Sequence, residues 1–90
     1  MQFMIYGLDK PGHGEVRAAN RNAHLAYLEG FTKNILIAGP LLGEDGAGSL
    51  LLMEFPDRKA VEAFSAGDPY RKAGLFQTVT ITPWRKTLPK

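Results

Sequence analysis

Residues 34–55 have the sequence NILIAGPLLGEDGAGSLLLMEF, and this stretch decides the fold class. It contains two short apolar segments, Asn34–Pro40 and Ser49–Phe55, on either side of the glycine-rich segment Gly43–Gly48. Both apolar segments are shorter than an ordinary helix and are bounded by glycine or proline. Although the leucines of the second segment favour a helix by propensity alone, the arrangement predicts two strands joined by a hairpin turn.

The residues before this hairpin add a strand and a helix. Gln2–Leu8 is an apolar run that stops at a loop rich in proline and glycine, so it predicts a first strand. Glu15–Phe31 is rich in Ala, Leu, Glu and Arg and has no proline, and its first glycine is Gly30. This composition predicts a helix of at least four turns.

The residues after the hairpin add a helix and a closing strand. A second helix is predicted from Asp57, a suitable N-cap, to Gly67. Its apolar side chains share one face: Ala60, Val61 and Phe64. A short helical turn follows from Asp68, and Phe76–Thr82 is a β-rich closing strand with threonines alternating along one face. The whole chain is therefore predicted to be an α+β protein, a ferredoxin-like βαββαβ fold with two helices on one face of an antiparallel sheet.

Length and strand composition together predict a homodimer. The chain of 90 residues fits one domain over residues 1–90. The first three predicted strands are apolar at consecutive positions, which indicates that both faces of the sheet are buried. Two helices cover only one face, so a second copy of the same sheet is the simplest cover for the other.

Composition excludes several classes of function. The absence of cysteine excludes disulfides, thiolate metal sites and cysteine nucleophiles. The amino terminus lacks the features of a secretion signal, and no apolar run approaches the roughly 18 residues of a membrane span, so we expect a cytoplasmic protein without membrane contact. A net charge of +2 is too small for a nucleic-acid footprint. Two histidines with scattered carboxylates give no metal site, and no cofactor motif is present.

The first helix carries the strongest indication of a functional site. Arg17, Arg21, His24 and Leu28 fall within an arc of about 60° on that helix. A core-facing stripe that becomes polar over half its length is typical of a helix that borders a cavity. The alternative is that the arginines extend to solvent while His24 is a buried histidine with a backbone partner, and the stripe alone leaves both interpretations open.

Asp68-Pro69-Tyr70 is a second candidate. Aspartate before proline is a natural N-cap, but a cap uses one carboxylate oxygen and leaves the other free to meet an imidazole. If Asp68 reaches His24, the pair forms a general acid or base, and a nearby arginine can hold an anionic oxygen of a substrate. Tyr6, on the first strand, is a candidate for lining a cavity beneath the helix, whereas the other aromatic residues are interpreted as packing residues.

Taken together, the motifs resemble the YCII-related family, and the resemblance runs from the first strand to Trp84. The matching features are Arg17 and Arg21 ahead of His24-Leu25, the segment Ala38-Gly39-Pro40-Leu41, Gly48-Ser49, Asp68-Pro69-Tyr70 with Ala73-Gly74, and Pro83-Trp84. The chain departs from the usual family pattern at Arg71-Lys72 and in its short hairpin.

The resemblance implies a dimeric α+β barrel with a cavity that holds a His-Asp pair, here His24 and Asp68. Ser49, Arg17 and Arg21 are then neighbours of a small anionic or ring-shaped ligand. Where an activity is suggested for the family, it is elimination or proton transfer without a cofactor, so we expect a lyase or an isomerase. The alternative is a non-catalytic dimer that binds a small ligand or serves a larger enzyme, with His24 and Asp68 as a structural pair.

Overall fold

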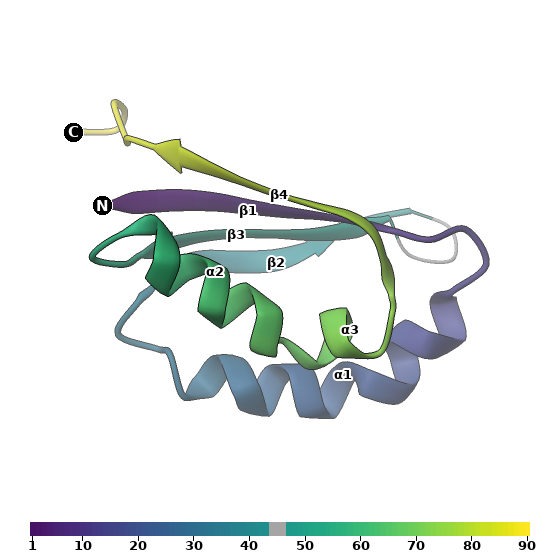
Figure 1. Ribbon diagram of the computed structural model, residues 1–90. Coiled ribbons are helices and arrows are strands. Elements are labelled where there is room, and N and C mark those ends of the chain that lie inside the picture. Colours follow the sequence, from purple (N-terminus) through teal and green to yellow (C-terminus); the bar gives the residue numbers. More distant parts are fainter. Residues whose placement is uncertain (44–46) are drawn as a thin grey trace.

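Four antiparallel strands form one sheet in the order β2-β3-β1-β4, and the helices lie on one side of it (Figure 1). The computed structural model describes residues 1–43 and 47–90. The strands are β1 (Gln2–Asp9), β2 (Ile35–Leu41), β3 (Gly48–Glu54) and β4 (Phe76–Trp84). The helices are α1 (Gly14–Glu29), α2 (Arg58–Gly67) and the short α3 (Pro69–Lys72). This arrangement confirms the predicted ferredoxin-like βαββαβ fold.

The core lies between the sheet and the helices. Alternate residues of the central strands point toward the helices, because successive side chains of a strand point to opposite faces. Phe3 and Ile5 of β1 pair with Met53 and Leu51 of β3, and all four are buried. Phe64 of α2 packs against this layer and is 3% exposed, a burial that contributes about 1.5–3 kcal/mol.

The predicted N-caps of α2 and α3 are confirmed. Asp57 accepts a hydrogen bond from the backbone N–H of Ala60, and Asp68 accepts one from that of Tyr70. The first helix ends at Glu29, two residues before the predicted end, because Phe31 lies in the turns that lead to β2.

The second strand differs from its prediction. It continues to Leu41, beyond the Gly39-Pro40 pair at which the predicted segment Asn34–Pro40 ends. Since β2 is an edge strand, it tolerates a proline, whose missing N–H costs no ladder hydrogen bond on the open side. The predicted hairpin turn lies partly outside the described residues.

In the single chain only one face of the sheet is covered, so the expected burial of both faces of β1 to β3 stays a prediction about the dimer. Burial alternates along β1, and β2 is mostly exposed. The face turned away from the helices carries a group of apolar side chains: Met4, Tyr6 and Leu8 of β1, Ile37 of β2, and Leu50 and Leu52 of β3. The threonines of β4 share one face of the sheet, as predicted. They lie on this same open face, opposite Met4, Tyr6 and Leu8.

No helix in the described part of the chain is long and apolar enough to cross a membrane.

Gly48 is expected to be indispensable for the pairing of β1 with β3. A Cβ atom at this position would collide with the backbone carbonyl oxygen of Gly7 on the neighbouring strand. We therefore expect Gly48→Ala to lower the free energy of unfolding by about 2–3 kcal/mol, measured by urea denaturation.

Gly39→Ala is the matched control, because a Cβ atom at Gly39 would meet nothing within 4 Å. Its free energy of unfolding should change by less than about 0.5 kcal/mol. Equal losses in the two variants would show that the close approach at Gly48 is not what makes glycine necessary there.

Candidate active site

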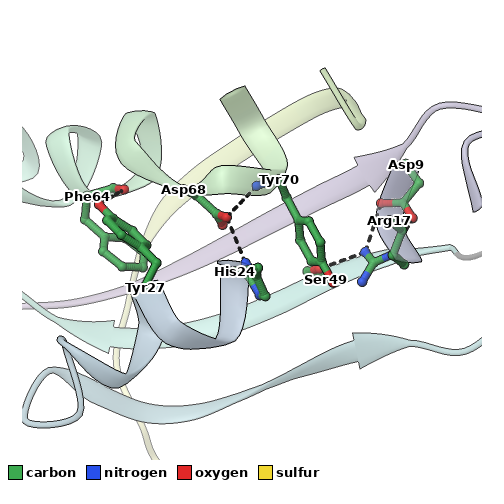
Figure 2. Close-up of polar contacts among 8 residues, drawn as sticks. All are labelled: Asp9, Arg17, His24, Tyr27, Ser49, Phe64, Asp68 and Tyr70. Carbon is green, nitrogen blue, oxygen red and sulfur yellow. Dashed lines mark hydrogen bonds and ion pairs between the residues drawn. The ribbon is translucent and has the colours of Figure 1, made fainter. Parts of the chain in front are cut away.

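A hydrogen-bonded pair joins α1 to the start of α3. The Nδ1 atom of His24 lies 2.8 Å from Oδ1 of Asp68, and both side chains are 8% exposed (Figure 2). The predicted contact between His24 and Asp68 is therefore confirmed. Since a carboxylate oxygen accepts, Nδ1 donates, and in the neutral ring Nε2 is then the unprotonated nitrogen. Nε2 has no hydrogen-bond partner among the described residues, and it points away from Asp68 (Figure 2).

One carboxylate oxygen serves both functions of Asp68. Oδ1 accepts from the backbone N–H of Tyr70 at 2.9 Å as well as from His24. The expectation that the cap and the imidazole use different oxygens is wrong. The reason is geometric, because α1 passes beneath the first turn of α3 and brings His24 to the side of Asp68 that already faces Tyr70 (Figure 2).

Arg17 is held by a second carboxylate that the sequence did not single out. Its Nε and Nη2 atoms donate to the two oxygens of Asp9 at 2.8 and 3.0 Å, a bidentate geometry. Nη2 also donates to Oγ of Ser49 at 2.9 Å. Asp9 ends β1 at an irregularity in its pairing with β4, and the Asp9 side chain is only 1% exposed. The hydrogen bond between Arg17 and Asp9 raises the pKa of the Arg17 guanidinium above its ordinary value, so the guanidinium stays charged.

The ring of Tyr70 fills the space between Arg17 and His24. It stacks on the imidazole at a centroid distance of 3.9 Å and an angle of 13°, and the guanidinium carbon of Arg17 lies 4.7 Å from the ring centroid. Figure 2 shows the phenol ring between the two side chains. Arg17 and His24 are two turns apart on α1, about 10.5 Å of helix rise, which leaves room for one ring between them. Burial raises the pKa of the Tyr70 hydroxyl, although both arginines act to lower it, so the phenol is neutral near pH 7.

A cavity of about 300 Å³ opens beside this group, between α1 and the sheet. Its polar lining comes from the residues Arg17, Arg21, His24, Ser49 and Tyr70. Its apolar lining comes from Leu25 and Leu28 of α1, Ala38, Gly39 and Pro40 of β2, and Leu51 of β3. The structure thus brings His24, Ser49 and both arginines to one cavity, with Asp68 behind His24.

Tyr6 does not belong to this group, and its predicted place beneath the helix is wrong. It pairs with Leu50 and Thr80, and the neighbours that precede and follow it on β1 are the ones that face the helices. Arg21 also differs from its predicted place on the core-facing stripe, because it is exposed at the edge of the cavity.

Sequence reasoning missed Asp9 and the place of Tyr70. The sequence does contain a pattern that indicates the Asp9–Arg17 pair. Asp9 is an acidic residue that directly follows the apolar run of the first strand, and the helix after it has an arginine in its first turn. Tyr70 was interpreted as a packing residue, but its ring lies between His24 and Arg17 and lines the cavity. In the described part of the chain, no three His, Cys, Asp or Glu side chains gather in a way that could hold a metal ion.

Comparison with solved structures agrees with the fold. The chain superposes with a TM-score of 0.92 on TftG, the 5-chloro-2-hydroxyhydroquinone dehydrochlorinase of Burkholderia phenoliruptrix AC1100, in complex with 2,5-dihydroxybenzoquinone. The two are 40% identical, over 97% of this chain and 96% of that chain. An antibiotic biosynthesis monooxygenase, at 12% identity and a TM-score of 0.54 over 94% of this chain and 98% of that one, shares the fold alone.

Sequence relatives identify the family. Protein YciI of Escherichia coli O6:H1 is 33% identical, over 96% of this chain and 98% of that protein. A Haemophilus influenzae protein of unassigned role is 31% identical with the same coverage. The model of the YCII-related domain matches residues 1–85. The chain therefore belongs to the YCII-related domain family.

Proposed function

We propose that this protein is a cofactor-independent lyase that eliminates a leaving group from a small, hydroxylated ring molecule. The observation that carries the proposal is the orientation of His24. Its Nδ1 is hydrogen-bonded to Asp68, while Nε2 lies beside a cavity and has no partner among the residues that the structure describes. This is the geometry of a general base that is oriented by a carboxylate.

His24 and Asp68 have distinct roles in the proposed step. The neutral imidazole takes a proton from the substrate at Nε2, the electron pair of the broken bond forms a new double bond, and the leaving group departs as an anion. Asp68 holds the ring in the tautomer that leaves Nε2 unprotonated and stabilises the imidazolium that forms. The imidazolium then returns its proton to water.

The solved relative supports this reaction class. TftG is named a dehydrochlorinase, and dehydrochlorination removes a proton and a chloride ion from one substrate. Its bound 2,5-dihydroxybenzoquinone is a small oxygenated ring. The cavity of about 300 Å³ is within the size range of small-molecule sites. We therefore choose 5-chloro-2-hydroxyhydroquinone as the first substrate to test on this protein.

His24→Ala should lower kcat/KM for chloride release from 5-chloro-2-hydroxyhydroquinone by about 100- to 10,000-fold, because the proton acceptor is lost. The measurement is steady-state release of chloride. His13→Ala is the matched control, since the His13 ring is hydrogen-bonded to the carbonyl oxygen of Pro11 and does not line the cavity. Turnover by His24→Ala at the rate of the parent protein would exclude the proposed mechanism.

The stability of the same variants separates this proposal from a purely structural pair. If the His24–Asp68 bond serves only to hold α1 against α3, its removal should lower the free energy of unfolding by about 1–3 kcal/mol and leave ligand turnover unaffected. A catalytic role predicts the opposite division, with the larger effect on the rate and the smaller one on stability.

We further propose that the protein is a homodimer in which the open sheet face is covered by a second copy. The apolar side chains of that face lie on three adjacent strands, and closed two-fold symmetry is the common rule for such self-association. Leu52 lies within this group, next to Met4 on one side and Ile37 on the other.

Leu52→Lys should convert the dimer into a monomer, because it places a charge within the buried interface. The measurement is sedimentation velocity at micromolar concentration. Ala63→Lys, on an exposed position of α2, should leave the dimer intact. A parent protein that is a stable monomer at this concentration would contradict the proposed dimer.

A further inference from the structure

The two arginines that line the cavity are in different electrostatic situations. We propose that Arg21, and not Arg17, supplies the charge that selects an anionic ligand, while Arg17 is a positioning residue for Ser49. This inference rests on the proposed function, because it concerns the ligand of the same cavity. It names the ligand class more closely, as a small ring with one anionic oxygen group.

The charge of Arg17 is already paired inside the protein. Both oxygens of Asp9 accept from its guanidinium, and the side chains of Arg17 and Asp9 are 16% and 1% exposed. One guanidinium and one carboxylate carry no net charge together, although the charge of Arg17 still acts on the neighbouring hydroxyl of Tyr70. One face of the guanidinium also lies against the ring of Tyr70.

Arg21 differs from Arg17 in this respect. Among the residues that the structure describes, no carboxylate lies within ion-pair distance of Arg21, whose side chain is exposed at the edge of the cavity. Like the charge of Arg17, the charge of Arg21 acts on the hydroxyl of Tyr70 and lowers its pKa. The positive charge that a ligand meets without a compensating carboxylate is therefore that of Arg21.

The contact between Arg17 and Ser49 gives Arg17 its role. Oγ of Ser49 accepts a hydrogen bond from Nη2 of Arg17 at 2.9 Å. A hydroxyl that accepts in this way keeps its own hydrogen for donation, and Ser49 lines the cavity. Arg17 thus fixes the Ser49 oxygen in place, and Ser49 donates to an oxygen of the ligand whether that oxygen is charged or neutral.

The test compares two probes of the same size, benzoate and benzamide, which differ in charge. Dissociation constants are measured by NMR titration of the labelled protein. The unsubstituted protein should bind benzoate about five- to twentyfold more tightly than benzamide. Arg21→Gln should reduce this ratio to about one, with the dissociation constant for benzamide unchanged.

Two variants of the Asp9–Arg17 pair provide the controls. Asp9→Asn with Arg17→Gln removes one positive and one negative charge together, so it should weaken both probes while it keeps their ratio within about twofold of the parent value. Asp9→Asn alone uncovers the charge of Arg17 and should raise the ratio. Thermal unfolding shows which variants are folded. If the double variant is not folded, the test rests on Asp9→Asn alone, in which the ratio of the two dissociation constants should rise.

A ratio that falls in the double variant and persists in Arg21→Gln would overturn the inference, as would equal binding of the two probes by the parent protein. A lowered or unchanged ratio in Asp9→Asn would overturn it as well. These outcomes are distinct from failure of the proposed function, because the ratio is an equilibrium measurement that does not involve proton transfer by His24. Loss of chloride release in the His24 variant tests that function separately.

Discussion

The site depends on a single oxygen atom, Oδ1 of Asp68. It caps α3 through the N–H of Tyr70 and accepts from the imidazole of His24. The first interaction fixes where α3 begins, and the second fixes α3 against α1. Because the same atom makes both bonds, the cap, the orientation of the imidazole and the path of the chain into Tyr70 are set together. A buried carboxylate in this position is stabilised only while its partners are present.

The ring of Tyr70 extends this constraint along α1. It lies against His24 on one side and Arg17 on the other. The spacing of two helical turns between these residues therefore sets how far the polar lining of the cavity extends along α1. Arg17 is then held from its far side by Asp9 at the end of β1 and by Ser49 at the start of β3. Segments from β1, α1, β3 and α3 thus meet through one continuous series of contacts. These contacts hold the side chains of the site in fixed relative positions, as the proposed proton transfer requires.

The sequence was sufficient for the order of elements and for the central pair, and insufficient wherever the face of a strand mattered. The turn residues at Gly43–Gly48 and the capping aspartates Asp57 and Asp68 fixed the βαββαβ order, because their chemistry is local. The contact of His24 with Asp68 followed from the family resemblance. The position of Tyr6 was wrong because a continuously apolar strand such as β1 does not reveal which of its alternating faces meets the helices.

Asp9 and the end of β2 were missed for related reasons. An acidic residue that ends a strand looks like part of the following loop, and only the packing of α1 against the sheet brings Arg17 to it. Pro40 looks like a strand terminator, and only its place on an edge strand makes it compatible with pairing. Both features depend on tertiary position.

The most direct test of the site is the protonation of the His24 ring. The His13→Ala variant leaves His24 as its only histidine, so labelling that variant with ¹⁵N-histidine gives one pair of ring nitrogen signals. Above the pH at which the ring becomes neutral, we expect Nδ1 to carry the hydrogen and Nε2 to be unprotonated, with the Nε2 signal shifting when a ligand is added. A neutral ring protonated at Nε2 would contradict the proposed role of Asp68 and, with it, the role of His24 as the base.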